Sequence, residues 1–224
     1  MSEPLVVAEE LARRFGEGAT VTEAVRRASC TVSSGERIAL VGPSGSGKST
    51  LLNLLGGLDS PTAGSICWPA LGPRESLRPD KIALVFQGPS LLLPLSVIEN
   101  VVFPLLLQGL SEHEASVLAL SALARFGVAD LRDKLPEEIS AGQAQRTAIT
   151  RAVASRPTLL LADEPTGQLD STTAGEVLIS LLDAIEGLGA AAVIATHDPL
   201  VAARLDILWE MNDGYLKTGA ECSI

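Results

Sequence analysis

Four short, mostly apolar runs mark the chain, at residues 37–41, 82–86, 159–162 and 191–194. Apolar runs of this length are typical of parallel strands that are buried on both faces. Glycine or polar residues follow each run within two positions, where the strands of an open α/β sheet present their ligand-binding groups. The pattern therefore predicts an α/β core.

Other segments carry helical periodicity. Residues 49–55 follow the first strand as a helix, and residues 172–188 place their apolar side chains at helical spacing. Ser111 and Glu114 form a capping box, which opens an amphipathic helix that should close at Gly127. A further helical pattern runs over residues 147–154.

The most apolar window, residues 90–107, lies in the middle of the chain. Four residues interrupt it and should prevent it from crossing a bilayer: Pro94, Glu99, Asn100 and Pro104. Its surroundings are rich in helical pattern. We expect one domain, with a helical subdomain at about 89–150 inserted into an α/β core of about 1–88 and 151–224.

Composition narrows the class of protein. The 224 residues include 17 basic and 27 acidic ones, a net charge of −10. This excess of acidic residues argues against nucleic acid as a partner, because a surface that binds nucleic acid needs clustered Lys and Arg. Cys30, Cys67 and Cys222 are scattered and indicate neither a disulfide framework nor a metal site. The first residues lack the pattern of a signal peptide, so we expect a cytoplasmic protein.

Residues 42–50 carry the first chemical signal, the pattern G-x-x-x-x-G-K-[ST] between a strand and a helix. In such a loop, glycines let successive N–H groups face phosphate oxygens at a helix N-terminus. Lys48 would contact the β- and γ-phosphates, and the Ser49 hydroxyl can ligate Mg²⁺. The candidate nucleotide-binding residues are Gly42, Pro43, Ser44, Gly45, Ser46, Gly47, Lys48, Ser49 and Thr50.

Asp163 and Glu164 end the apolar run at 159–162. Carboxylates at the end of a buried parallel strand lie in the crevice where α/β sheets bind ligands. Asp163 would hold Mg²⁺, and Glu164 would polarise the attacking water. Adjacent carboxylates can also start a helix, but Pro165 and Thr166 follow here and favour a loop.

Further motifs follow in a fixed order. Residues 139–146, Ile-Ser-Ala-Gly-Gln-Ala-Gln-Arg, resemble the Leu-Ser-Gly-Gly-Gln signature of ABC ATPases. Gln87, residues 167–170 and His197 match that family's Q-loop, D-loop and switch histidine. Phe15 falls where the family has an aromatic side chain that stacks on adenine. The matches span nearly the whole chain.

The resemblance implies a P-loop NTPase of the ABC ATPase type, with a RecA-like core, an antiparallel β subdomain and an inserted helical subdomain. ATP and Mg²⁺ are its implied cofactors. Ser49, Gln87 and Asp163 would surround the metal, while Glu164, His197 and Gln87 would serve catalysis. Ser140, Gly142 and Gln143 would cap the ATP that is held by a second copy, in a head-to-tail dimer.

Residues 55–64, 163–170 and 210–214 resemble the ATPases of lipoprotein-release and macrolide-export systems, and the division ATPase that controls cell-wall hydrolases. This implies an integral membrane permease as partner, with the ATPase peripheral on the inner face of the plasma membrane. Two functions stay open. The chain could drive export or extraction of a substrate, or regulate an extracellular hydrolase without transport.

Two departures from the family pattern stand out. Ala141 replaces the first signature glycine and adds one methyl group. Residues 65–79 look short for the antiparallel sheet and helix that usually lie there. In addition, residues 91–107 are too apolar for a fully solvated surface. They should either pack inside the helical subdomain or receive a cytoplasmic helix of the permease.

Overall fold

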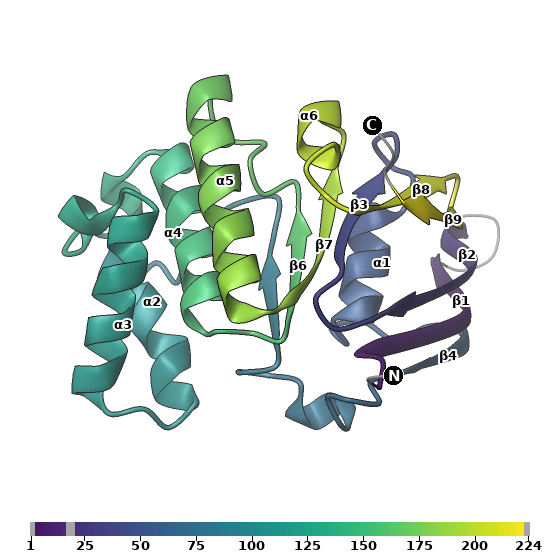
Figure 1. The fold of residues 1–224 in the computed structure, drawn as a ribbon, viewed down its shortest axis with the longest axis horizontal. Coiled ribbons are helices and arrows are strands. Elements are labelled where there is room, and N and C mark those ends of the chain that lie inside the picture. The colour runs from purple at the N-terminus through teal and green to yellow at the C-terminus, as the bar shows by residue number, and fades with distance from the viewer. Residues whose placement is uncertain (1–2, 17–20, 222–224) are drawn as a thin grey trace.

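A six-stranded sheet forms the centre of the molecule (Figure 1), in a computed structural model that describes residues 3–16 and 21–221. Its strand order is β5-β6-β7-β3-β8-β9. The first five strands are parallel, and β9 runs antiparallel to β8. The strands are β3 (Arg37–Val41), β5 (Ile82–Val85), β6 (Leu159–Asp163), β7 (Ala191–Thr196), β8 (Ile207–Asn212) and β9 (Tyr215–Glu221). All four apolar runs are confirmed as strands of this sheet.

A second, antiparallel sheet lies beside the first, in the order β2-β1-β4. Its strands are β1 (Val6–Phe15), β2 (Thr22–Val32) and β4 (Ala63–Cys67). The segment that looked short supplies β4 and then only a 3-10 turn, η2 (Arg74–Ser76). Trp68 packs between them and donates from Nε1 to the carbonyl of Leu55 at 2.8 Å, so it is a packing residue.

Within the described residues, six α-helices accompany the sheets: α1 (Lys48–Leu55), α2 (Val97–Leu107), α3 (Glu112–Arg125), α4 (Ala141–Ala154), α5 (Ser171–Leu188) and α6 (Pro199–Ala202). The capping box at Ser111 and Glu114 is confirmed at the start of α3. Helix α4 begins six residues before the predicted 147. Ser140 caps it through a capping box with Gln143, which hydrophobic periodicity does not reveal.

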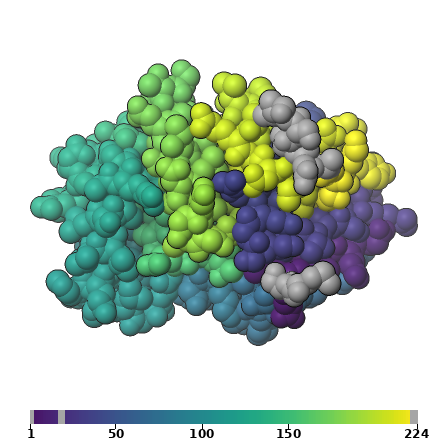
Figure 2. Space-filling model, viewed as in Figure 1, coloured from purple at the N-terminus to yellow at the C-terminus, as the bar shows by residue number. Residues whose placement is uncertain are grey.

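The six-stranded sheet separates two hydrophobic cores. Helices α2 to α5 cover one face, and α1 with the antiparallel sheet covers the other (Figure 1). Alternate residues of the central strands serve opposite cores: Leu160 and Ala162 of β6 face the helices, while Leu159 and Leu161 face α1. In Figure 2 the helical segment forms one end of an elongated molecule and the N-terminal strands the other.

The apolar window divides between the core and the surface. Val97, Val101 and Leu105 of α2 are buried, whereas Leu92 and Leu93 are 42% and 71% exposed. Phe103, Leu106 and Leu107 are exposed as well. Over residues 3–16 and 21–221, we find no helix with the length and apolar character needed to span a bilayer.

Two of the three cysteines are described, and both are free. Burial raises the pKa of the Cys30 thiol to about 12, so this cysteine behaves as an inert core residue. Cys67 is exposed at the end of β4. Cys222 lies outside the described residues.

Candidate active site

An open cleft of about 820 Å³ lies at the carboxyl ends of the parallel strands. The segments that follow β3, β5, β6 and β7 all contribute to it, as expected for a ligand site of an α/β sheet. Its lining residues are Val21, Thr22, Glu23, Ala24, Arg26, Ser44, Gly45, Gly47, Lys48, Ser49, Thr50, Gln87, Asp163, Glu164, His197, Asp213 and Gly214.

The loop after β3 presents its backbone to this cleft. Gly47 has φ 106°, and a Cβ atom there would overlap the carbonyl oxygen of Ala24, so only glycine fits. It caps α1 without a side chain, which leaves the first-turn N–H groups of that helix for an anion. Lys48 donates from Nζ to the carbonyls of Gly42 and Pro43, at 2.8 and 3.1 Å, which fixes its ammonium group at the loop.

Glu164 and His197 meet at the ends of neighbouring strands. The His197 Nδ1 and the Glu164 Oε1 are 2.8 Å apart. Glu164 is buried and adopts φ 47°, a left-handed conformation that is unfavourable for a glutamate. Its N–H donates to the carbonyl of Ala195 at 2.9 Å, which ties the strained residue to β7. Because Nδ1 is occupied, any contact of this histidine with a phosphate falls to Nε2.

Three oxygen donors line the same cleft: the Ser49 hydroxyl, the Gln87 amide and the Asp163 carboxylate. All three also line an adjoining hollow of about 310 Å³. Hard oxygen ligands, with few carboxylates, suit Mg²⁺, which keeps several of its waters. These donors therefore fit the expected metal.

The remaining loop residues lie behind the cleft. Ser46 is buried, and its carbonyl accepts from the Gly214 N–H at 3.0 Å. A Cβ atom at Gly42 would overlap the carbonyl oxygen of Met211. Gly42 and Pro43 reach the site only through their bonds to Lys48. The contacts of Gly42 and Ser46 hold the loop against β8 and against the β8–β9 turn.

The signature residues do not line the cleft. Ser140 accepts from the Gln143 N–H at 3.2 Å, and the Gln143 Oε1 accepts from the Ser140 N–H at 2.9 Å. Gly142 packs beside Leu169. Ala141 is exposed and helical, without a positive φ, so its methyl group strains nothing in the backbone. The motif thus forms a helix N-terminus that is separate from the phosphate-binding loop of its own chain.

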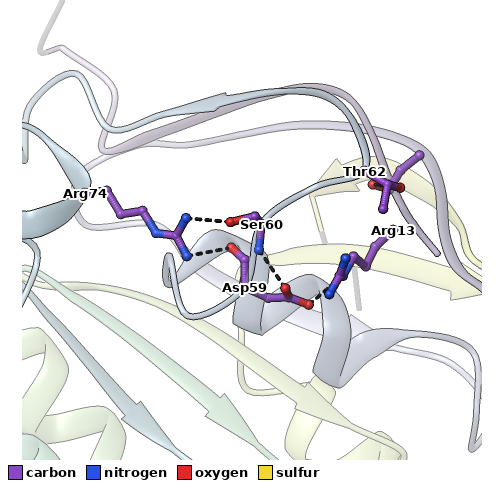
Figure 3. A network of polar contacts seen from close by, with 6 residues as sticks. Arg13, Asp59, Ser60, Thr62 and Arg74 are labelled. Carbon is purple, nitrogen blue, oxygen red and sulfur yellow. Dashed lines mark hydrogen bonds and ion pairs between the residues drawn. The ribbon is translucent and has the colours of Figure 1, made fainter. Parts of the chain in front are cut away.

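Phe15 also lies outside the lining, at the end of β1, with its side chain 43% exposed. The Arg13 guanidinium lies 4.5 Å from the centre of its ring. Figure 3 shows Arg13 held in turn by Asp59, at 2.7 Å. Arg74 braces the same turn, since it donates to the Ser60 hydroxyl and to the Asp59 carbonyl, at 2.7 and 3.2 Å. Arg13 thus covers one face of the Phe15 ring, but the structure does not bring this ring into the cleft.

Comparisons with known proteins agree with this geometry. A family model described as ABC transporter matches residues 25–167. The chain belongs to the ABC transporter family. The lipoprotein-releasing system ATP-binding protein LolD of Gluconobacter oxydans is 45% identical over 93% of both chains, and LolD 1 of Rhodospirillum rubrum is 42% identical over 92% of this chain and 94% of its own length.

Solved structures of ABC cassettes share the fold as well. A dimeric structure of the cassette MJ0796 is 33% identical, with a TM-score of 0.90, over 98% of this chain and 99% of that one. A post-hydrolysis dimer of the same cassette, bound to ADP and Pi, is 32% identical with a TM-score of 0.89 and the same coverage. This ABC protein is an ATPase, and its predicted fold is confirmed.

Sequence reasoning missed one wall of this ABC ATPase cleft. Residues 21–24 and Arg26, in β2 and just before it, line the cleft without matching any motif. Asp213 and Gly214 line it too, although in the sequence they stand out only as part of a stretch that resembles the family. Asp-Gly between two strands is a strong hairpin signal, and Asp213 and Gly214 do take positive φ values in that turn. The Arg26 N–H donates to the Gly214 carbonyl at 2.7 Å, and this contact between distant segments is invisible in a local pattern.

Proposed function

We propose that this ATPase forms a head-to-tail dimer on ATP and thereby drives a membrane permease that extracts or exports a substrate, as its relatives named LolD suggest. One observation carries the proposal. The residues predicted to bind and hydrolyse the nucleotide line one cleft, while the signature motif forms an exposed helix N-terminus outside that cleft. A second copy can present that end to the γ-phosphate, so ATP becomes part of the dimer interface.

The cleft residues divide the chemistry among them. The loop N–H groups and Lys48 hold the phosphates. Ser49, Gln87 and Asp163 would hold Mg²⁺, which would supply positive charge beside the phosphate oxygens. Glu164 orients the attacking water and accepts a proton from it. His197, braced by Glu164 at Nδ1, contacts the γ-phosphate through Nε2.

Phe15 serves the adenine base in this proposal. Its exposed face provides a stacking surface, while Arg13 and Asp59 hold its other side. Stacking needs only a rigid aromatic ring near the base. Phe15→Leu should therefore raise the KM for ATP and leave kcat almost unchanged.

The surface between the Q-loop and α2 is the proposed permease site, with the ATPase held peripherally at the inner face of the membrane. Asn100, fully buried on α2, accepts from the Leu92 N–H and donates to the carbonyls of Leu92, Leu95 and Ser96. These bonds fix the loop that exposes Leu92 and Leu93. A rigid apolar loop just after Gln87 suits a coupling contact, because little ordering entropy is lost on docking.

Glu164→Gln tests the enzymatic half of the proposal. It keeps the shape of the side chain but removes the base, so turnover should fall by at least about 100-fold while ATP traps a dimer, seen by size-exclusion chromatography. Glu176→Gln, an exposed change on α5, is the control. Parental turnover in Glu164→Gln would contradict the catalytic role.

Ser140→Arg tests the dimer. The larger side chain should prevent closure over the partner's nucleotide and abolish the ATP-dependent dimer in the Glu164→Gln background. Ser111→Arg is the matched control, because Ser111 caps α3 through a capping box of the same kind. A dimer that survives Ser140→Arg but not Ser111→Arg would place the interface elsewhere.

Leu93→Glu tests the permease site, with a candidate membrane permease as bait. Co-purification should be lost while ATPase activity in solution stays within about twofold, since a surface charge rarely disturbs the fold. Ile179→Glu on α5, also exposed, should retain the permease. If the bait instead activates a cell-wall hydrolase and moves no substrate, the regulatory alternative is correct.

A further inference from the structure

Gln145 lies little more than one turn into α4, and its side chain is completely buried. Its Nε2 donates to the carbonyl of Phe86 at 3.1 Å and to that of Pro165 at 3.2 Å. Phe86 directly precedes Gln87, and Pro165 directly follows Glu164. One amide thus joins the two loops that enter the cleft from β5 and β6 to the helix that carries the signature.

The two acceptors fix the orientation of this amide. A flipped side chain would place Oε1 against two carbonyl oxygens, none of which can donate. In the observed orientation Oε1 is buried, and no group within the described part of the chain donates to it. Buried polar atoms are seldom left in this state, because they have lost their water. An apolar side chain would avoid that loss, so the value of Gln145 lies in its two donor bonds.

A second attachment lies farther along α4. Arg151 donates to the Ser90 carbonyl from Nη1 and to the Ser90 hydroxyl from Nη2, both at 2.8 Å. Residues 87–89 therefore lie between two attachments to the same helix. The backbone that carries Gln87 is thus tied to α4 on both sides.

We infer that Gln145 is a positioning residue, which sets the Gln87 loop and the Glu164 loop relative to each other and couples both to the N-terminal end of α4. The inference rests on the proposed function, since that helix end acts on ATP only across the dimer. Gln145 touches neither nucleotide nor water in this scheme. It acts through the backbone of the residues next to Gln87 and Glu164.

Gln145→Leu and Gln145→Met test this, because both fill a similar volume without a donor. We expect kcat for ATP hydrolysis to fall at least about tenfold, with the KM for ATP within about threefold of the parent. Thr150→Val is the matched control. Thr150 is equally buried on α4, but its hydroxyl donates within the helix, to the Arg146 carbonyl at 2.8 Å. Its kcat should stay within about twofold.

The fraction of dimer formed with ATP gives a second measurement, which should not change if Gln145 serves only to pack the core. In the Glu164→Gln background, adding Gln145→Leu should lower the dimer fraction at saturating ATP, whereas adding Thr150→Val should not. The inference is overturned if both Gln145 variants keep the parental kcat. It is also overturned if kcat falls only in proportion to the folded fraction measured by circular dichroism. Absence of a dimer in Glu164→Gln alone instead contradicts the proposed function, and the kcat comparison then decides the role of Gln145.

Discussion

Glu164 combines a strained backbone with the central chemical role. A left-handed conformation costs a non-glycine residue about 1–2 kcal/mol, and the surrounding structure must supply that energy. It does so through the bonds from the Glu164 N–H to Ala195 and from His197 to the carboxylate. The strain aims the carboxylate away from the strand direction and into the cleft.

Gly47 offers a sharper test of the loop at the residue scale. Gly47→Ala should abolish ATP binding and lower the free energy of unfolding by more than about 1–2 kcal/mol, because its methyl group overlaps the Ala24 carbonyl and φ is 106°. Fluorescent-nucleotide titration and thermal unfolding measure the two effects.

Gly175→Ala serves as its control. Gly175 lies within α5 and has open space around the added methyl group, so alanine should stabilise the fold by about 0.5–1 kcal/mol and leave ATP binding unchanged. Equal losses in both variants would show that Gly47 is sensitive only to general destabilisation.

The sequence predicted which motif residues gather at the cleft, while their chemical roles stay predictions. Residues 44–50 apart from Ser46, with Gln87, Asp163, Glu164 and His197, could be placed at the cleft because each motif has a fixed position relative to a strand end. Gln145 could not be singled out, since a glutamine inside a helix gives no local sign of which carbonyls it meets. Phe15 stays a prediction.

At the scale of the elements, carboxylates repeatedly cap helices. The Glu114 carboxylate accepts hydrogen bonds from the Ser111 hydroxyl and from the Ser111 backbone N–H, and these bonds, the hydroxyl bond foremost, lower the pKa of this carboxyl. The same kind of capping lowers the pKa of Glu99, Glu138 and Asp170. Such a group contributes stability that is present above its ordinary pKa and is lost as pH falls through the lowered folded-state value.

Glu114→Gln tests this contribution. The melting temperature of the parent should fall below pH 4–5, near the ordinary carboxyl pKa of about 4.3, more steeply than that of Glu114→Gln, which cannot titrate at this position. Glu112→Gln, one position into α3 and outside the capping box, should follow the parent profile. Identical profiles for parent and Glu114→Gln would show that the cap stabilises the helix independently of charge.

Element boundaries followed the sequence unevenly. Strands β5, β6 and β7 were predicted because they are apolar on both faces, and α5 because its stripe is regular. The antiparallel strands β1 and β2 came only from the family resemblance. Their alternation is broken by charged residues and by register shifts near Leu11 and Arg13, which hide the period of two.

The whole molecule contains two cores on either side of one sheet. Leu123 of α3 and Leu11 of β1 are both fully buried, one in each core. Leu123→Ala and Leu11→Ala should each cost about 2–5 kcal/mol of unfolding free energy. Hydrogen exchange should differ between them, with faster exchange in α2 and α3 for the first and in β1 and β2 for the second. Uniform acceleration in either variant would mean that the two cores open together.

Strand β6 has a consequence for misfolding. Because Leu159 to Ala162 are apolar on both faces, a one-residue slip would still set these four side chains against hydrophobic neighbours. It would, however, displace Asp163 by about 3.3 Å and turn it to the opposite face. Such a slipped protein would be compact and would keep its secondary structure, but it would not hydrolyse ATP. Screens of variants near this strand should therefore measure ATP turnover, because solubility and melting temperature would not distinguish the slipped register from the native one.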